Sequence, residues 1–538
     1  MRAFCLLMAG LCQGLAAETP SDSDRLRRRG LESITLEELR EDVEFFSSEA
    51  MRGREAGSEA NRRSAEFLAE RFSRLGLEPA GEEGYFQPVT LVRSLLAGDN
   101  RLLFKTGRTG AETPLSLQET FTAERFSASG EASGRLVFAG YGITAPEWGY
   151  DDYQQVDVDG RIVLILPGQP EGRDEDARHG QELEKLLNAQ RHGAAAAIVL
   201  DRSHNMSFSA HLAWPKDLST QRFLLQEEVD QVRIPAVRVA LEAVEERLLT
   251  SGLDVELFIQ ESGRYAKPRS FLLPSLEAEL AVSVERQAFQ VRNVLGRLEG
   301  SDPQVSQQVV VLGAHFDHIG TRGAEIYPGA DDNASGVSAL LEIAEALTEG
   351  RRPPRRSVLF AGFNAEEKGL LGSRHYVRHA RIPLDETVAM FQMDMIGRDE
   401  EIPATDDYRF TGLELQTARQ NQNALNVLGY SFSQDLRELV NRSNRRVLLQ
   451  VRFRYDDHPI DLLQRSDQWP FLERGVPSLL FTTGLHPDYH RPGDTADKLN
   501  YSKMERVAQL VYLCVWEAAE AQSRPAFDGT PLISPPGQ

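Results

Sequence analysis

Residues with metal-binding side chains follow apolar segments in the C-terminal half of this sequence. His315 follows the run VVVLGA, Asp394 follows VAMFQM, and Tyr489-His490 comes after PSLLFTTG. Taken singly, an aspartate at the end of a strand is more often a helix cap, and a surface glutamate is usually only solvated. Together, histidines and carboxylates supply the nitrogen and oxygen ligands that suit zinc. We therefore favour a zinc site over solvated loops, with the candidate ligands His315, Asp331, Glu367, Asp394 and His490.

The number of candidate ligands indicates how many zinc ions they could hold. A catalytic zinc takes about three protein ligands and a water, so two zincs that share one carboxylate need about five residues. The candidates match that number and leave Glu366 over. Because adjacent carboxylates rarely bind one ion in good geometry, Glu366 is free to act as general base on a metal-bound water. The pattern is typical of a two-metal hydrolase.

The segments that would position these residues alternate between strand and helix patterns. Parallel strands present ligands beyond their carboxyl ends, which is where the candidate residues occur. Residues 263–523 are therefore predicted to form the main catalytic domain, an α/β unit in which helices flank a mostly parallel mixed sheet. A helix with one apolar face follows Ser335. The all-apolar runs typical of buried strands are 309–315, 357–363, 388–394 and 477–484.

Short β-rich runs separate this unit from two N-terminal helices. Residues 35–126 begin with amphipathic helices, the first capped by Thr35 and Glu38, and form the N-terminal part of the catalytic domain. Residues 127–262 carry valine-rich and isoleucine-rich runs around a charged helical stretch, which predicts a small β-rich insert. Residues 524–538 contain four prolines and are predicted to be a flexible tail.

The extreme N-terminus has the pattern of a secretory signal peptide. Residues 1–17 combine one arginine, an apolar stretch and small residues, which predicts cleavage near Ala17 and a secreted or periplasmic protein. Leu11 is too large for the usual lipidation site before Cys12, so a lipid anchor is not favoured. Residues 18–34 are polar and charged and are predicted to be a flexible leader.

The composition excludes several other classes of protein. The chain has 538 residues, and 60 Lys and Arg against 81 Asp and Glu give a net charge of −21. Such a charge repels nucleic acid and anionic lipid, and no apolar run beyond the N-terminus reaches the ~20 residues of a membrane span. Cys514 is the one cysteine left after signal removal, so an intrachain disulfide is excluded. The sequence leaves the oligomeric state open.

Several motifs together resemble the co-catalytic dinuclear zinc aminopeptidase family, which includes secreted bacterial leucyl-type aminopeptidases and glutamate carboxypeptidase II. The motifs are GAHFDHIG, YPGADDNASGVSALLEIA, FNAEEKGLLGS, MDMIGR, and SDQWPF with DYHRPGDTADKLN. The resemblance implies two Zn²⁺ per chain, bridged by Asp331. It implies that one zinc is completed by His315 and Asp394 and the other by Glu367 and His490.

The same resemblance implies roles for residues around the ligands. Glu366 would be the general base, and the hydroxyl of Tyr489 would steady the tetrahedral oxyanion, although a packing role for Tyr489 is equally compatible with its position. Asp317 would accept a hydrogen bond from the imidazole of His315 and so fix its tautomer. A simple turn residue is the alternative for Asp317.

Two further acidic residues are expected to support the ligands. Asp332 would be joined to Asp331 by a cis peptide bond, and Asp494 follows the last histidine motif. Where similar family members have Ser-Asp-His, this chain has Ser466-Asp467-Gln468. That difference leaves the role of the third position open and does not affect the predicted metal ligands.

The resemblance also implies a function for the whole chain. The insert at 127–262 resembles a protease-associated domain, which would narrow access to the zincs as a lid or act as a passive spacer. The expected activity is that of a zinc metallo-exopeptidase that hydrolyses the N-terminal bond of peptide substrates. One alternative is a carboxypeptidase or dipeptidase in which Arg398 or Arg491 binds a substrate carboxylate. A receptor-like member without activity is disfavoured because the ligands and the base are all present.

Overall fold

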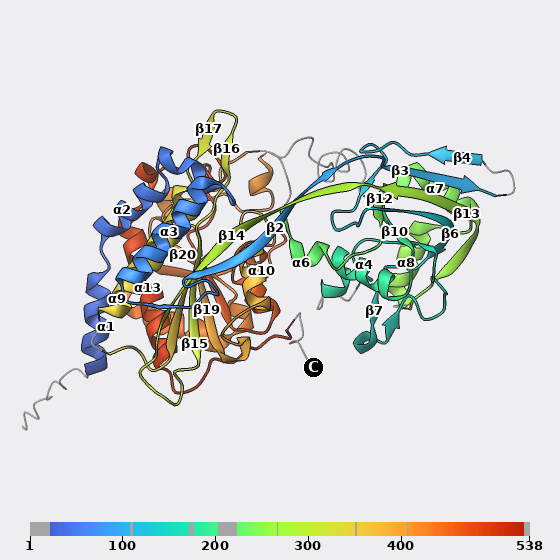
Figure 1. The fold of residues 1–538 in the computed structure, drawn as a ribbon. Coiled ribbons are helices and arrows are strands. Elements are labelled where there is room, and N and C mark those ends of the chain that lie inside the picture. The colour runs from blue at the N-terminus through green and yellow to red at the C-terminus, as the bar shows by residue number, and fades with distance from the viewer. Residues whose placement is uncertain are drawn as a thin grey trace, which may run out of the picture.

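The computed structural model of the protein describes residues 22–107, 111–171, 177–202, 223–265, 267–349, 352–405 and 407–531. Within them the chain forms two lobes, which we call the main unit and the insert, joined by a long two-stranded ribbon (Figure 1). The signal peptide expected at 1–17 lies outside the described residues. In the part of the chain that the structure describes, no helix is long and apolar enough to cross a membrane.

A ten-stranded mixed sheet forms the centre of the main unit. Its central strands run parallel and its outer strands mostly antiparallel, which confirms the predicted α/β class. The short strand β1 (Glu78–Pro79) pairs with β14. The other strands, in order across the sheet, are β11 (Phe223–Leu225), β2 (Phe86–Leu96), β14 (Val284–Leu298), β18 (Ser357–Phe363), β15 (Val309–His315), β19 (Thr387–Met393), β22 (Ser478–Thr482), β20 (Ala424–Leu428) and β21 (Gln450–Phe453).

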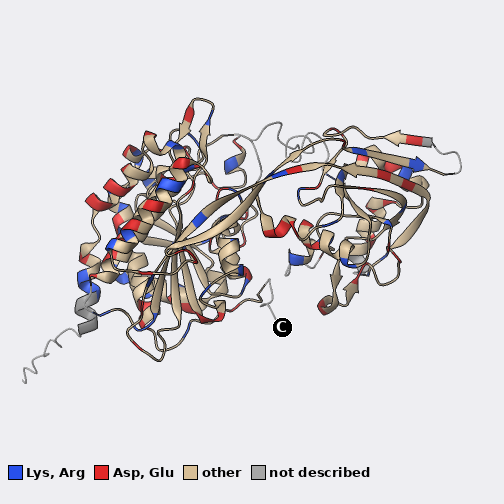
Figure 2. Ribbon diagram, in the orientation of Figure 1, with Lys and Arg blue, Asp and Glu red and all other residues tan. Residues whose placement is uncertain are grey.

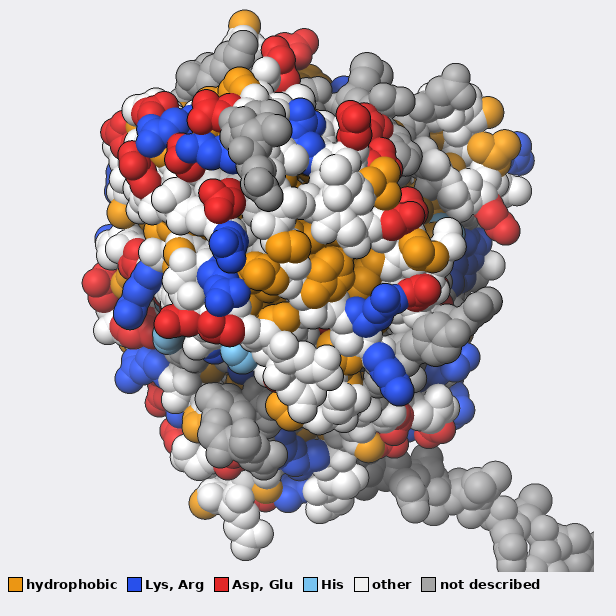
Figure 3. All heavy atoms as spheres, turned by 90° about the vertical axis from the view of Figure 1, so that its right-hand side faces the viewer, with side chains coloured by type: hydrophobic (Ala, Val, Ile, Leu, Met, Phe, Trp, Pro, Cys, Tyr) orange, Lys and Arg blue, Asp and Glu red, His pale blue; other side chains and the backbone are white. Residues whose placement is uncertain are grey.

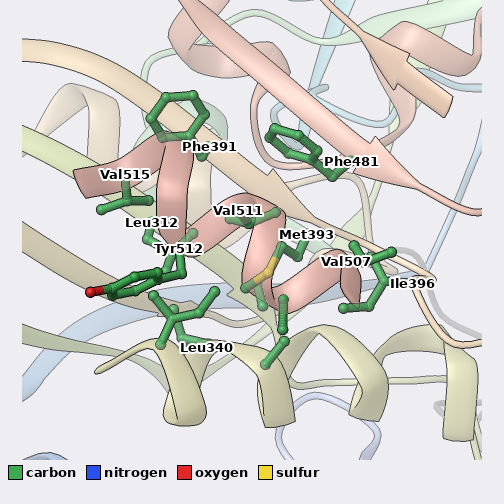
Figure 4. Close-up of a cluster of buried hydrophobic side chains, with 14 of the residues drawn as sticks. Leu312, Leu340, Phe391, Met393, Ile396, Phe481, Val507, Val511, Tyr512 and Val515 are labelled. Atoms are coloured by element: carbon green, nitrogen blue, oxygen red, sulfur yellow. The ribbon is translucent and has the colours of Figure 1, made fainter. Parts of the chain in front are cut away.

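Helices cover both faces of this sheet and bury its apolar residues. Leu340 and Val511, from two helices on one face, share an apolar cluster with Leu312 of β15 (Figure 4). Burying each such side chain contributes roughly 1.5–3 kcal/mol. The helices on this face are α1 (Asp22–Ser33), α2 (Leu36–Phe46), α3 (Glu59–Arg74), α9 (Gly336–Thr348), α11 (Gln434–Val447) and α13 (Tyr501–Glu520). The opposite face packs against α10 (Leu371–Arg378) and α12 (Trp469–Glu473).

The insert has its own eight-stranded sheet and is larger than the predicted 127–262. Strands before and after that range belong to the same sheet, because β13 pairs with β3 on one side and β6 on the other. The strands, in order, are β4 (Ala111–Pro114), β3 (Arg101–Thr106), β13 (Phe271–Val282), β6 (Gly130–Phe138), β9 (Ile162–Ile165), β10 (Ala196–Asp201), β12 (Ala236–Ala240) and β5 (Phe121–Ala123). Its helices include α4 (Glu182–Arg191), α7 (Leu241–Thr250) and α8 (Val255–Tyr265).

Among the described residues, two strand pairings connect the insert with the main unit. The first is the ribbon of β2 and β14, which pair from Phe86↔Val294 to Leu96↔Val284. The second is β11, which lies between β10 and β12 in the chain yet pairs with β2 in the main sheet. The helix α6 (Gln226–Val229) follows it and lies between the lobes (Figure 1). On the outer side of the insert, apolar side chains gather near the centre and charged side chains surround them (Figure 3).

The described residues near both chain ends are more ordered than predicted. Residues 22–33, expected in the flexible leader 18–34, form α1, and the Tyr512 hydroxyl on α13 donates a hydrogen bond to the Arg27 carbonyl. The described part of the tail predicted at 524–538 is also attached, since Arg524 donates a hydrogen bond to the Thr387 carbonyl at 2.9 Å. Charge and proline content did not reveal these contacts because both depend on the surface of the finished main unit.

Candidate active site

The carboxyl ends of the parallel strands meet at one edge of the main sheet, where the candidate residues gather. β15 ends at His315, and β18 ends immediately before the segment Asn364–Glu367. β19 ends immediately before Asp394. Because β15 pairs in parallel with β18 on one side and β19 on the other, these distant segments become neighbours. The strand order therefore accounts for the cluster that the sequence motifs predicted.

The carboxylate of Asp332 lies between two histidines. Its Oδ1 is 3.5 Å from His315 Nε2, and its Oδ2 is 3.1 Å from His490 Nε2. The Oε2 atom of Glu367 is 3.2 Å from the same nitrogen of His490. Asp332 is thus the carboxylate that connects the two halves of the cluster.

His315 faces two further carboxylates. Its Nε2 is 3.4 Å from Asp394 Oδ1 and 3.8 Å from Glu366 Oε2. This nitrogen is buried, and among the described residues it has no hydrogen-bond partner. The separations are close to the ~3.3 Å expected between ligands of a tetrahedral zinc ion. The donor set therefore fits a metal of that kind, in groups comprising His315, Glu366 and Asp394, and His318, Asp332 and Glu367.

Asp331 lies behind this cluster, which corrects the bridging position predicted for it. Its Oδ2 is 3.3 Å from His486 Nε2, and among the described residues neither candidate metal group at this edge includes Asp331. The Asp494 carboxylate accepts hydrogen bonds from the main-chain N–H groups of both Asp331 and Asp332 at 3.1 Å. This contact holds the turn so that Asp332, expected only to support the ligands, lies among them. The cis peptide bond is at Asp332–Asn333, one residue later than expected.

Asp317 supports the glutamates rather than the histidine tautomer. Its carboxylate accepts hydrogen bonds from the main-chain N–H of Glu366 at 3.0 Å and of Glu367 at 3.3 Å. The closest approach of that carboxylate to His315 Nδ1 is 3.8 Å, whereas the main-chain carbonyl of Asp317 lies 3.2 Å from this nitrogen. The predicted pairing of imidazole and carboxylate is therefore replaced by a main-chain contact.

The two adjacent glutamates differ in their electrostatic surroundings. Burial, together with the neighbouring carboxylates, raises the pKa of Glu366 well above its usual range, although His315 acts in the opposite direction. Burial also acts to raise the pKa of Glu367, but the charges and hydrogen bonds of His490 and His318 hold it well below its usual range. Glu367 is therefore kept ionised, whereas Glu366 can take up a proton.

Arg54 is a supporting residue that the sequence did not single out. Its guanidinium is fully buried and donates hydrogen bonds to the carbonyls of Phe316 at 3.0 Å, Pro328 at 2.7 Å and Gly329 at 3.0 Å. It thereby joins the loop after His315 to the loop before the two aspartates. Burial lowers the pKa of Arg54 to about 10, which leaves it charged at neutral pH. The only sequence signal is an arginine within the turn RGREAGS, which is also the pattern of a surface turn.

Two other polar residues hold candidate ligands in place. The Ser466 hydroxyl donates a hydrogen bond to Asp394 Oδ2 at 2.6 Å. His318 Nδ1 lies 2.7 Å from Glu367 Oε1, and His318 is fully buried. The motifs GAHFDHIG and SDQWPF contained both residues, but neither motif indicates which ligand each would contact.

A cavity of about 300 Å³ opens beside the cluster. Tyr489 lines it and stacks on His490, with ring centroids 3.8 Å apart. Burial and the neighbouring carboxylates raise the pKa of the Tyr489 hydroxyl well above its usual range, so this group remains a hydrogen-bond donor. Apolar side chains form much of the remaining wall, namely Met395, Leu428, Leu462, Leu480 and Leu485.

Comparison with known proteins identifies both lobes. Residues 293–515 match peptidase family M28, and residues 132–246 match the PA domain. The chain is 26% identical over 405 residues to Aminopeptidase YwaD of Bacillus subtilis (strain 168), which covers 73% of this chain and 71% of that protein. It is 24% identical over 422 residues to a Glutamate carboxypeptidase 2 homolog of Caenorhabditis elegans, which covers 68% of this chain and 52% of that protein.

A solved structure with the same architecture is the aminopeptidase from Aneurinibacillus sp. strain AM-1. It aligns with 95% of this chain and 98% of its own at a TM-score of 0.52 and 20% identity, which establishes a shared fold. Fold, site and sequence matches together define a hydrolase that acts on peptide bonds. Within the main unit the match is to peptidase family M28, and within the insert it is to the PA domain.

Proposed function

We propose that this protein is a dinuclear zinc exopeptidase that hydrolyses the N-terminal bond of peptides. The observation that carries the proposal is the Asp332 carboxylate, whose two oxygens lie 3.5 Å from His315 and 3.1 Å from His490. The similarity to Aminopeptidase YwaD supports cleavage from the N-terminus. The signal-peptide pattern of residues 1–17 supports secretion or export to the periplasm.

The proposed ligand sets share Asp332. His315 and Asp394 complete one set, and Glu367 and His490 complete the other. Zinc bound there would polarise the scissile carbonyl and lower the pKa of the attacking water. His490 is preferred to His318 as a ligand because its Nε2 reaches both Asp332 and Glu367 within 3.2 Å and it lines the cavity.

Glu366 is the proposed general base. Its carboxylate lines the cavity and belongs to neither proposed ligand set. Burial raises its pKa above the usual carboxylate range, which makes it a stronger acceptor for the proton of the attacking water, and it would return that proton to the leaving amine. The hydrogen bond from the Glu366 main-chain N–H to Asp317 fixes the backbone that carries the base.

Tyr489 is the proposed donor to the tetrahedral oxyanion. Its raised pKa keeps the hydroxyl protonated, and its ring is stacked on His490 at the wall of the cavity. The main-chain carbonyl of Tyr489 accepts a hydrogen bond from Arg409, which restrains the loop. A donor restrained in this way stabilises developing negative charge without reorganising during the reaction.

The apolar wall of the cavity is proposed to accept the side chain of the N-terminal residue. Met395, Leu428 and Leu480 offer no charged partner, and a volume of about 300 Å³ accommodates a single side chain together with its backbone. The carboxylates of Glu366 and Asp394 at the same cavity would attract the substrate ammonium group. The enzyme should therefore prefer peptides that begin with leucine, methionine or phenylalanine.

One peptide offered in three forms tests the direction of cleavage. The forms have both ends free, the N-terminus acetylated, or the C-terminus amidated. We expect acetylation to abolish cleavage and amidation to leave the rate nearly unchanged, because the ammonium group is the part of the substrate that the carboxylates bind. Metal analysis of the same preparation should give at least two zinc ions per chain, the number that the proposed site holds. The reverse pattern of rates would make the enzyme a carboxypeptidase.

The second candidate function is that of a carboxypeptidase, which needs a cation at the cavity to bind the substrate carboxylate. Arg465 is a cation in that position. Arg465 lines the cavity wall and is exposed. The arginines first considered for this role are paired, Arg398 with Asp488 at 3.0 Å and Arg491 with Asp407 at 3.6 Å. Replacing Arg465 by glutamine should change KM for C-amidated and free peptides equally if the N-terminus is recognised.

A further inference from the structure

Three side chains of metal-binding type also meet away from the active site, where α6 of the insert contacts α10 of the main unit. They are Glu227 on α6, His375 on α10, and His379 directly after the last residue of α10. Their ligand atoms all lie within 4.8 Å of one another. The Glu227 carboxylate is 2.5 Å from His379 Nε2 and 3.9 Å from His375 Nδ1.

The spacing of the two histidines makes them a matched pair. Residues four apart lie on the same side of a helix, and the rings of His375 and His379 are 4.5 Å apart between centroids. Figure 1 shows α6 between the two lobes on the side of α10, and Figure 2 shows acidic residues on α6. A carboxylate from one lobe therefore faces two imidazoles from the other.

We propose that Glu227, His375 and His379 bind a zinc ion that fastens the insert to the main unit. Two imidazole nitrogens and one carboxylate oxygen, with water in the fourth position, form a common zinc set. The 3.9 Å between His375 and Glu227 would shorten, and the 2.5 Å between His379 and Glu227 would lengthen, each by less than ~1 Å to reach the ~3.3 Å expected between tetrahedral ligands. This site is separate from the zincs of the proposed function.

The charges around the three residues are compatible with a cation. Burial acts to raise the pKa of Glu227, but hydrogen bonds with His375 and His379 outweigh it and lower that pKa to about 2. Arg378 approaches Glu227 at 3.2 Å but also contacts Glu228 at 2.6 Å. Glu227 and Glu228 supply two negative charges against the guanidinium of Arg378, whose neighbour Arg474 is itself offset by Glu473, and His379 is about half exposed, so the position is open to solvent.

Occupancy of this site would connect the insert to the segment that carries the proposed general base. β11 and α6 are the part of the insert that crosses to the main sheet. On the other side, α10 begins at Leu371, shortly after Glu366 and Glu367. A zinc ion at the contact would therefore restrain both the crossing segment of the insert and the helix after the glutamates.

Metal content of the full chain tests the proposal. The protein is stripped with a chelator, dialysed against zinc chloride and analysed for zinc per chain. We expect the wild type to hold one zinc more than Glu227→Gln and His379→Gln, with peptide turnover at saturating zinc within about twofold. His179→Gln is the matched control, because it removes a histidine paired with Glu147 at 2.7 Å within the insert and should leave the zinc content unchanged.

Hydrogen exchange gives a readout that does not depend on activity. In the wild type, zinc at ten times its dissociation constant should slow exchange in residues 223–232 and 371–379 by about tenfold through mass action. The two variants should show no zinc-dependent slowing there while residues 364–367 respond as in the wild type. Equal zinc content in all proteins, an equal loss in His179→Gln, or identical exchange in the wild type and both variants would overturn the proposal.

Discussion

Both lobes bury charged side chains beside parallel strands, but the two lobes differ in whether these side chains have hydrogen-bond partners. In the insert, the Asp152 carboxylate accepts hydrogen bonds from the main-chain N–H groups of Tyr141 and Ile143 and from the Tyr150 hydroxyl, at 2.9 to 3.0 Å. At the edge of the main sheet, His315 Nε2 has three carboxylates within 3.8 Å but, among the described residues, no hydrogen-bond partner.

The difference shows that burial of charge alone does not identify a catalytic site. Each oxygen of Asp152 is occupied by a donor from the fold, so the group can only hold its own loop together. His315 is equally buried, yet its outward nitrogen remains available to a ligand that the fold does not contain. The insert also buries polar atoms without a hydrogen-bond partner, such as Thr122 Oγ1 and Tyr153 OH, so the edge of the main sheet is distinguished by an available nitrogen that several carboxylates surround.

Glu366→Gln should cause the largest effect. Glutamine keeps the shape but cannot accept the proton, so we expect kcat to fall by about 10³-fold or more while zinc content is unchanged. Steady-state rates on an arylamide substrate together with metal analysis check this. Glu367→Gln is the control, since the neighbouring residue is a proposed ligand and its loss should remove zinc. Full activity of Glu366→Gln would show that the proposed base is wrong.

The variants Asp332→Asn and Asp331→Asn test which of the two adjacent aspartates is a zinc ligand. Asp332→Asn should reduce zinc content and lower kcat/KM by about 10²-fold, because the shared ligand loses its charge. Asp331→Asn should retain zinc, since its carboxylate contacts His486 and the turn behind the site. Zinc loss in Asp331→Asn with full zinc in Asp332→Asn would restore the bridging role predicted from the sequence.

Asp152→Ala tests whether the hydrogen-bonded carboxylate in the insert contributes to stability and not to catalysis. Removing it leaves three buried donors without an acceptor, which should lower the free energy of unfolding by about 3 kcal/mol. Activity per folded chain should be unchanged, because the residue lies in the insert. Urea unfolding of this variant beside Asp157→Ala, an exposed aspartate expected to cost less than about 1 kcal/mol, provides the comparison. A loss of turnover without loss of stability would contradict the distinction drawn above.

Glu342→Gln should have the smallest effect on turnover and appear mainly as a change in the pH dependence of stability. Burial and the charges of Glu38 and Asp42 raise the pKa of Glu342 to about 8. The folded state therefore holds the proton more tightly, and this contribution to stability is present below about pH 4.5 and is lost as pH rises through about 8. Unfolding free energies should fall between pH 5 and pH 9 by roughly 4 kcal/mol less in Glu342→Gln than in wild type, with the value at pH 7 in between. Glu349→Gln at the end of the same helix is the control.

The fold class and most of the cluster could be predicted, because apolar runs mark the parallel strands and the polar residues follow them directly. The choice between Asp331 and Asp332 could not. Both precede the same helix, and the outcome depends on hydrogen bonds from their N–H groups to Asp494, far along the chain. A shift of one residue reverses which side chain faces the histidines, and local patterning contains no information on that shift.

The contacts between the two lobes also could not be predicted from local sequence patterns. The sequence predicted the insert as a closed segment, whereas β11 leaves it to pair with β2 of the main sheet. A three-residue strand has too few positions for a period to be detected. Arg54 raises the same difficulty, because its partners are main-chain carbonyls that carry no residue-specific signal.

The ribbon of β2 and β14 constrains how the chain can be made. Leu96 pairs with Val284, which is synthesised about 190 residues later, so the main-chain groups of Leu96 have no partner in that strand until then. At translation rates of about 5 to 20 residues per second, that interval is on the order of 10 to 40 s. During this time β2 is an exposed edge with alternating buried positions, the kind of segment that pairs with the wrong strand. Production of this protein should therefore depend on holding the nascent chain apart from its neighbours until residue 298 has emerged.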